Sequence, residues 1–343
     1  RDTPRTRAVT LVGDAGVGKS RLLYEFEGWL ASDAAGPAEP QVLRGRAMPE
    51  MQGVPYSLLR DLFRERFDIL DSDDVATVRA KFEAGVRPWL DGERACLAGH
   101  LVGFDFSGAS AVHHLLGSPN FGMQAQAYLV QYFRGVTAGR PTVACLEDIH
   151  WADNSSLDFL ARLVQELGER PCLVVCLARP ARYERRPEWD AGIALARLDL
   201  HPLSPNDSRG LVAEILRNVD ELPGDLEDLI VRSAEGNPFY VEELIRMFLE
   251  DGVIVRGDTR WAVALERLRD VRVPSTLVGV LQSRLDALPL EERELLQRAS
   301  VVGRLFWDAA VAQLRAQDAP AIDVPAALGA AQARELIFAH ERS

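Results

Sequence analysis

The chain has 343 residues, of which 47 % are hydrophobic and 26 % charged, the proportions of an ordinary globular protein. At roughly 150 residues per domain, this length predicts two or three domains. The formal net charge of −12 opposes binding to nucleic acid, so we do not expect direct nucleic-acid binding without a local basic patch. No stretch approaches the ~20 apolar residues of a membrane span, and no apolar signal segment follows the first residues.

The four cysteines give no pattern of a disulfide framework or a metal site. Cys145, Cys172 and Cys176 fall in apolar, strand-like runs, where cysteine acts as a small buried hydrophobe. We therefore expect reduced thiols, no membrane contact and a cytoplasmic location.

The first predicted element is a short buried strand at residues 8–12, followed by a glycine-rich loop and an amphipathic helix from Arg21. The loop fits the phosphate-loop pattern G-x-x-x-x-G-K-[ST] at every fixed position. Glycines allow backbone N–H groups to curl around a phosphate chain, and the helix N-terminus favours its negative charge. We expect this segment to bind ATP or ADP through Gly13, Asp14, Ala15, Gly16, Val17, Gly18, Lys19, Ser20 and Arg21.

Two side chains of this loop have separate predicted roles. Lys19 is one of only two lysines in the chain, and it would place a point charge at the β- and γ-phosphates. Ser20 would offer its hydroxyl to Mg²⁺. A glycine-rich turn that matches by chance is the alternative, but the flanking strand and helix both agree with the motif.

The next part of the chain contains a second predicted strand at 41–44 and, further on, a glycine-rich span at 92–121. That span shows no clear period, and we expect it to be a loop or a variable insertion.

A third apolar strand, at 142–147, ends in two acids, Glu147 and Asp148, about 125 residues after the phosphate loop. A carboxylate at such a strand end can hold Mg²⁺, and its neighbour can orient or deprotonate the attacking water. The alternative is an ordinary strand end with solvated acids.

A helix is predicted at 155–167, with Asp153 and Asn154 as capping candidates, and further strands at 172–177 and 195–200. Short apolar strands that alternate with helices predict an α/β fold, in which a parallel sheet has helices on both faces. Its ligand should lie at the carboxyl ends of the strands.

A domain boundary is predicted near 201–207, where Ser204 can cap a helix and Pro205 suits its first position. A helical region should extend to about 250, followed by a hairpin around Arg256–Arg260. From 275 onward, a stripe of leucines predicts a core-facing helix, followed by a second helix at 291–300; the stripe consists of Leu277, Leu281, Leu285 and Leu288. We expect a nucleotide-binding domain at 1–203, a helical domain at 204–272 and a third domain at 273–343.

The segment Leu146-Glu147-Asp148-Ile149-His150-Trp151-Ala152-Asp153 resembles the signature of signal-transduction ATPases with numerous domains, the STAND group. Within that group, the resemblance is to the AAA-like ATPase modules of large bacterial LuxR-type transcription regulators and multidomain adenylate/guanylate cyclases. Three later segments are similar to the family as well. They are the strand ending at Arg179, the G-N-P-F motif at 236–239, and the residues from 273 that resemble the opening of a winged-helix domain, which would be truncated here.

The resemblance implies roles for single residues. Glu147 would hold Mg²⁺ and Asp148 would position water, although many related ATPases have Asp first and Glu second, which leaves these two roles exchangeable. Arg179 would contact the γ-phosphate, or else be a solvent-facing arginine before a turn. Pro238 would pack on adenine, although a helix-initiating proline capped by Asn237 explains it equally well.

The resemblance also implies an ATP-binding, slowly hydrolysing switch module within a larger signalling protein, with effector and sensor domains elsewhere. Nucleotide-dependent self-association is a further expectation. Two alternatives remain open, an ATPase motor that moves a substrate and a DNA-binding regulator that acts through the winged helix.

Overall fold

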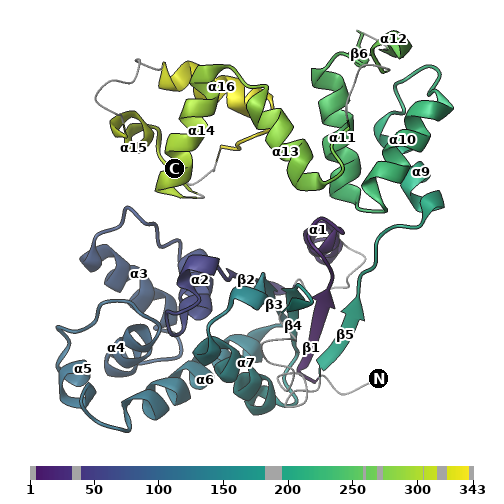
Figure 1. Ribbon diagram of the computed structural model, residues 1–343. Helices are drawn as coiled ribbons and strands as arrows, with labels where there is room; N and C mark the ends of the chain where they lie inside the picture. The colour runs from purple at the N-terminus through teal and green to yellow at the C-terminus, as the bar shows by residue number, and fades with distance from the viewer. Residues whose placement is uncertain are drawn as a thin grey trace. The chain divides into compact units, whose positions relative to one another are not determined.

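The computed structural model describes residues 5–32, 40–181, 195–257, 260–268, 273–303, 305–314 and 323–339. The chain divides into two compact units, Arg1–Pro202 and Leu203–Ser343 (Figure 1). This division lies beside the predicted end of the nucleotide-binding domain at residue 203. The further boundary predicted at residue 273 stays a prediction.

The first unit is built on a parallel five-stranded sheet with the order β2-β3-β4-β1-β5. The strands are β1 Arg7–Val12, β2 Gln41–Arg46, β3 Thr142–Glu147, β4 Cys172–Ala178 and β5 Leu195–Asp199. All five predicted strands are therefore confirmed, with β2 two residues longer than expected. Apolar residues run through β1, β3 and β4 because parallel strands are covered on both faces.

The helices of this unit cover the two faces of the sheet unequally. The described helices are α1 Lys19–Leu30, α2 Ser57–Arg66, α3 Val75–Val86, α4 Gly92–Leu101, α5 Ser110–Leu115, α6 Phe121–Gly139 and α7 Asn154–Leu167, with short 3-10 turns η2 Pro49–Met51 and η3 Ile149–Trp151. Buried residues of α1 belong to one core with Leu11 and Val175. The helices between β2 and β3, together with α7, build the larger core on the other face.

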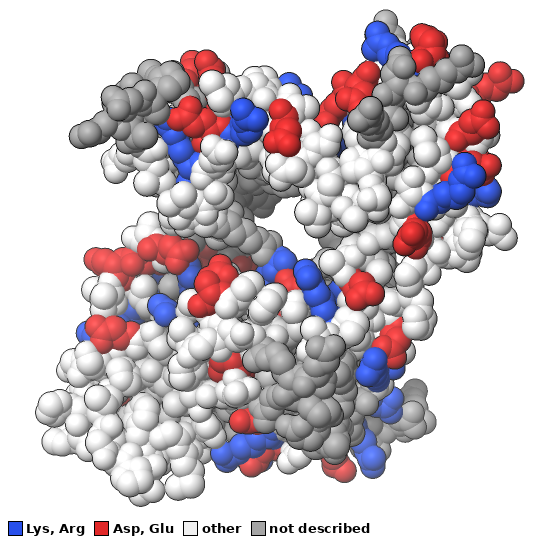
Figure 2. Space-filling model, in the orientation of Figure 1, with Lys and Arg blue, Asp and Glu red and all other residues white. Residues whose placement is uncertain are grey.

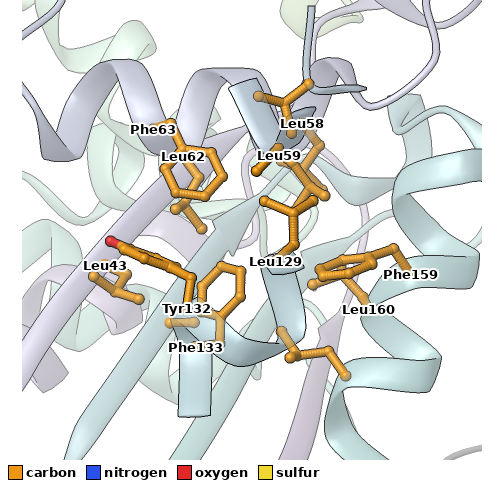
Figure 3. Close-up of a cluster of buried hydrophobic side chains, with 14 of the residues drawn as sticks. Leu43, Leu58, Leu59, Leu62, Phe63, Leu129, Tyr132, Phe133, Phe159 and Leu160 are labelled. Atoms are coloured by element: carbon orange, nitrogen blue, oxygen red, sulfur yellow. The ribbon is translucent and has the colours of Figure 1, made fainter. Parts of the chain in front are cut away.

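The larger core is dominated by aromatic and leucine side chains from helices far apart in the sequence (Figure 3). Phe63 of α2 lies 5.3 Å from the Tyr132 ring of α6 and 5.3 Å from the Phe82 ring of α3, measured between ring centroids. Each fully buried side chain of this size contributes roughly 1.5–3 kcal/mol to folding. The helical layer is thus a folded part of the first unit rather than a loose appendage.

The prediction that residues 92–121 form a loop was wrong, because α4 and α5 both lie within that span. Asp91 caps α4 by accepting a hydrogen bond from the Arg94 N–H at 3.0 Å. Gly99 faces the Phe106 ring so closely that a Cβ would collide with it. The glycine here permits close packing of an aromatic ring, which sequence periodicity does not reveal.

The second unit is mainly helical. Its described elements are α9 Pro205–Ile215, α10 Gly224–Ala234, α11 Pro238–Glu250, β6 Ile254–Arg256, β7 Trp261–Val263, α12 Leu265–Leu268, α13 Leu277–Asp286, α14 Leu290–Val302, α15 Asp308–Gln313 and α16 Val324–Ala333. Ser204 caps α9 by accepting from the Asp207 N–H at 3.2 Å, with Pro205 at the first position, as predicted. The predicted hairpin is also present, since β6 and β7 pair antiparallel.

The leucine stripe predicted from 275 onward lies partly on the buried face of α13. Leu277 packs against the core of the second unit and Leu288, just after the helix, is 8 % exposed, whereas Leu285 is 36 % exposed. Arg284 is also buried, where it pairs with two carboxylates of α11. The apolar pattern did not predict that an arginine takes a core position.

From residue 273 to 339, the described residues form the helices α13 to α16 and no strand, so the assignment of a winged helix rests on the sequence resemblance. Over the described part of the chain, no helix combines the length and the apolarity needed to cross a bilayer.

Candidate nucleotide-binding site

The carboxyl ends of three neighbouring strands, β3, β4 and β1, bring most of the predicted site residues to one edge of the sheet. Val12 of β1 pairs with Ala178 of β4, so the phosphate loop after β1 begins beside Arg179. The Gly13 N–H donates a hydrogen bond to the Ala178 carbonyl at 3.2 Å. On the other side of β4, Glu147 ends β3 in register with the last residue of β2. This is the edge where ligands of open parallel sheets bind.

The backbone of the phosphate loop requires its glycines. A Cβ at Gly13 would lie 2.8 Å from Val17 Cγ2 and 2.9 Å from the Leu200 carbonyl oxygen, so only glycine fits. Gly16 and Gly18 have φ of 83° and 100°, a region that favours glycine. Gly18 is the N-cap of α1 and supplies no side-chain acceptor, which leaves N–H groups at the helix start for an anion.

Lys19 is folded back onto the loop. Its Nζ donates hydrogen bonds to the carbonyl oxygens of Gly13 and Asp14, each at 2.7 Å, and the residue is 9 % exposed. Burial lowers the pKa of Lys19, and the positive charge of Arg179 lowers it further, while Asp148 and Asp14 oppose the shift. A phosphate chain in the loop would offset that cost by supplying negative charge to the ammonium group.

The Ser20 hydroxyl and the Glu147 carboxylate lie together in front of the loop. Ser20 Oγ donates to Glu147 Oε2 at 3.0 Å, although the two residues are 127 positions apart. Hard oxygen ligands of this kind suit Mg²⁺, which is commonly held by one or two protein groups plus phosphates and water. Among the described residues, no group of three His, Cys, Asp or Glu side chains forms a metal cage, and Mg²⁺ held partly by phosphates needs none.

Asp148 has a different partner from its neighbour. Its Oδ2 accepts from Arg46 Nε at 2.9 Å and lies 2.7 Å from Arg46 Nη2. Asp148 has φ 54°, an uncommon conformation for a residue other than glycine, and it turns the chain from β3 into the 3-10 turn η3. The two acids are therefore separated: Glu147 faces the loop serine, and Asp148 faces the end of β2.

Arg46 was not among the residues predicted from the sequence, because the predicted strand ended at residue 44. Its backbone N–H donates to Asp61 Oδ2 of α2 at 2.7 Å. Burial raises the pKa of Asp61, and the hydrogen bond from Arg46 partly opposes that shift. Continuing the strand through Gly45 to Arg46 would have placed this arginine at the same edge as the acids.

The end of the motif around residues 150–153 has a structural role. Asp153 is 3 % exposed and caps α7 by accepting from the N–H and the hydroxyl of Ser156 at 2.8 and 2.6 Å. It also accepts from the Tyr56 N–H at 2.8 Å and the Ser57 hydroxyl at 3.1 Å. One buried carboxylate thus joins the starts of α2 and α7, and the pairing with α2 could not be read from local sequence.

Three further predicted residues lie on or directly after α1, β4 and α11. Arg179 is exposed at the end of β4, on the same sheet edge as Lys19. Arg21 points along α1, where its guanidinium pairs with Glu25 at 2.6 Å. Pro238 belongs to the second unit, at the start of α11, where Asn237 caps the helix by accepting from the Tyr240 N–H at 3.2 Å. The roles of these residues in nucleotide binding stay predictions.

Comparison with known families shows which protein family the chain belongs to. The family described as "AAA ATPase domain" matches residues 1–175 of the 343. The chain belongs to the AAA ATPase domain family. The predicted AAA-like P-loop ATPase module is therefore confirmed, whereas the assignment of nucleotide binding to the loop at 13–20 stays a prediction. The finer resemblance to the STAND group stays a prediction.

Individual relatives add context. An uncharacterized protein of Rhizobium meliloti (strain 1021) is 26 % identical over 312 residues, which cover 86 % of this chain and 27 % of that protein. The chain thus spans about a quarter of the length of this relative. Among solved structures, the ORC2 protein of Aeropyrum pernix, in complexes with ADPNP and ADP, is 14 % identical with a TM-score of 0.42 and covers 99 % of this chain and 82 % of that one. Cdc6p from Pyrobaculum aerophilum is 12 % identical with a TM-score of 0.46, over the same shares of the two chains.

Proposed function

We propose that this chain is the ATP-binding, slowly hydrolysing switch module of a larger bacterial signalling protein, a transcription regulator or a cyclase. The observation that carries the proposal is the hydrogen bond between Ser20 and Glu147 in front of a phosphate loop whose lysine is already in place. In this proposal, ATP·Mg²⁺ binds at the sheet edge, with the phosphates on the loop N–H groups and Lys19 and with Mg²⁺ on Ser20 and Glu147.

The separation of the two acids supports one assignment of their roles. Glu147 is the metal acid, because its carboxylate already lies against the loop hydroxyl. Asp148 is the acid that positions the attacking water, and its Oδ2 is held by Arg46. Both contacts from Arg46 are to Oδ2, so the other oxygen, Oδ1, is the one that would orient the attacking water, and the ion pair would hold the carboxylate in place for it.

Nucleotide can act as a switch only if it binds one conformation of the protein more tightly than another. Arg179 on the first unit senses the γ-phosphate, and Pro238 on the second unit contacts adenine. Nucleotide-dependent self-association of the larger protein is part of this proposal. A cytoplasmic location with reduced cysteines is part of this proposal.

Single-turnover hydrolysis and equilibrium binding of ATP and ADP test the proposal. A switch should hydrolyse ATP well below the median enzyme rate of about 10 s⁻¹ and retain ADP through purification. Glu147→Gln should lose the Mg²⁺ dependence of ATP binding, and Asp148→Asn should bind ATP normally but hydrolyse it at least about tenfold more slowly.

Two results would contradict the proposal. Rapid, substrate-stimulated turnover would favour a motor, which was the alternative left open by the sequence. Parent-like hydrolysis in both acid variants would remove the assignment of the acids. On the face shown in Figure 2, Lys and Arg side chains are interspersed with Asp and Glu, so this face offers no basic patch to DNA.

A further inference from the structure

A cavity of about 360 Å³ lies in the second unit, between α11, β6, α13 and the end of α16. This volume is within the range of small-molecule sites. Positive side chains outnumber negative ones in its wall, although the whole chain has a formal net charge of −12. The charged residues of the wall are Arg246, Glu250, Arg256, Arg284, Arg334 and Glu335.

Part of this charge forms a fixed frame. The Arg284 side chain is 4 % exposed and pairs with Glu243, whose side chain is 2 % exposed, and with Glu250 at 2.8 Å. Buried ion pairs rarely stabilise a protein more than apolar packing would, but they do fix geometry. Arg284 and Glu250 therefore neutralise each other within the wall and hold α11 against α13.

Two other arginines keep donors available to the cavity. The guanidinium of Arg256 lies over the Trp261 ring, 5.0 Å from its centroid. Among the described residues, no carboxylate forms an ion pair with Arg256. Arg334 pairs with Glu292, which is not in the wall, through Nε at 3.0 Å, and its side chain is 40 % exposed. Each guanidinium has five N–H donors, so a single such contact leaves capacity for an oxyanion.

The remaining arginine of the wall is occupied by a carboxylate of the protein itself. Arg246 of α11 pairs through Nη1 with the buried Glu243 at 2.9 Å and through Nη2 with Glu335, which follows the end of α16 and is half exposed. Glu335 has φ 56°, and the N–H groups of Glu335 and Leu336 donate to the carbonyls of Gln332 and Ala331. This is a helix end at which glycine is strongly preferred. Glycine would relieve the strain at this position but could not form an ion pair. The glutamate therefore indicates that the ion pair with Arg246 has a role.

We propose that this cavity binds a small organic oxyanion, with the Glu335 carboxylate as a built-in substitute that the ligand displaces from Arg246. Arg256 and Arg334 supply the other donors for the charged groups. Leu249, Ile254 and Val255 line the same cavity and offer an apolar surface to the carbon part of the ligand. The proposal concerns the second unit alone and does not depend on the function proposed for the sheet edge.

Calorimetric titration with two probes, inorganic phosphate and succinate, tests this site and distinguishes a phosphate ligand from a dicarboxylate. The titrations use the Lys19→Ala chain, because the phosphate loop could itself bind phosphate. At least one probe should bind, and its affinity should fall tenfold or more in Arg256→Gln and in Arg334→Gln. Arg217→Gln is the matched control, since Arg217 is exposed, pairs with Glu214 and does not line the cavity.

Variants of Glu335 test whether its carboxylate competes with the ligand for Arg246. Glu335→Gln keeps the backbone but removes the competing charge, so the affinity for the probe should rise several-fold, whereas Glu214→Gln should leave it unchanged. Glu335→Gly should show the same rise and also relieve the positive φ. Hydrogen exchange with and without the probe should show protection at 246–256 and 331–336.

No binding of either probe to the Lys19→Ala chain and its Glu335→Gly variant would overturn the proposal. Equal affinities in the Arg256, Arg334 and Arg217 variants, or protection confined to other segments, would overturn it as well.

Discussion

The charged residues of the two units differ in what surrounds them. At the sheet edge, Lys19 is bonded to loop carbonyls and Glu147 to a serine hydroxyl, all neutral partners that a nucleotide and a metal ion can replace. In the second unit, the buried side chain of Arg284 lies between two carboxylates. We infer that Lys19 and Glu147 are available to bind a ligand, because a ligand can replace their neutral partners. Arg284 instead fixes the packing of α11 against α13, because its ion pairs are buried.

The strongest test of this comparison is Lys19→Ala. ATP affinity should fall on the order of 100-fold or more, because contacts of an ammonium with phosphates are charge-assisted. The fold should change little, since the buried ammonium is held at a lowered pKa and its loss removes that cost of burial. Isothermal calorimetry gives the affinity and circular dichroism the fold.

The control for this variant is Lys81→Ala, which removes the other lysine of the chain. Lys81 pairs with Asp73 at 2.7 Å and lies on α3, so ATP affinity should stay at the parent value. Unchanged affinity in a folded Lys19→Ala protein would refute the assignment of the loop lysine.

Arg284→Ala should have the opposite profile. The free energy of unfolding should fall by up to about 3–5 kcal/mol, because the buried Glu243 would keep only its ion pair with Arg246. Denaturant unfolding measures this change, and nucleotide affinity should be unaffected. Arg217→Ala, which breaks an exposed pair, should stay within about 0.5 kcal/mol of the parent. A loss below about 1 kcal/mol for Arg284→Ala would show that the frame is not fixed by this ion pair.

Arg179→Ala tests whether this arginine of the first unit contacts the γ-phosphate. A contact with the γ-phosphate worth about 1.5–3 kcal/mol corresponds to a preference for ATP over ADP of roughly tenfold or more. The variant should lose that preference, whereas Pro238→Ala should weaken ATP and ADP alike, since adenine is common to both. Affinities of both nucleotides for both variants decide the matter, and equal losses in the arginine variant would exclude the sensor role.

The smallest expected effect is at Asp61, beneath Arg46. Burial raises the pKa of Asp61 above its usual 3.8, so its neutral form is favoured in the folded protein. The stability contributed by this group is present below pH 3.8 and is lost as the pH rises through the folded pKa. Relative to the parent, Asp61→Asn should therefore gain stability as the pH is raised from about 4 to 7. Thermal unfolding across this range measures the difference, and parallel curves would show that Asp61 does not titrate abnormally.

Much of the sheet and the loop could be predicted from sequence because their determinants are local. A strand buried on both faces is a short apolar run, and Gly16 and Gly18 are required by backbone conformations within the loop itself. Caps are local as well: Ser204, Asp153 and Asn237 each bond an N–H three residues away. Such features need no knowledge of the rest of the fold.

Other features depended on partners far along the chain. Arg46 meets Asp148 only because β2 and β3 are paired, 102 positions apart in sequence. From sequence, Gly99 suggests a loop, but in the structure it lies in α4 and packs against the Phe106 ring.

The amino-acid sequence by itself determined that this chain folds around a parallel sheet with a phosphate loop, because apolar runs and backbone demands at glycine act over a few residues. Only the tertiary structure decided which acid faces Ser20, that an arginine lies on the buried face of α13, and where the arginines of the second unit gather. Those outcomes depend on desolvation and ion pairing between distant segments, since a charged side chain becomes part of a core only where the fold brings an opposite charge to it.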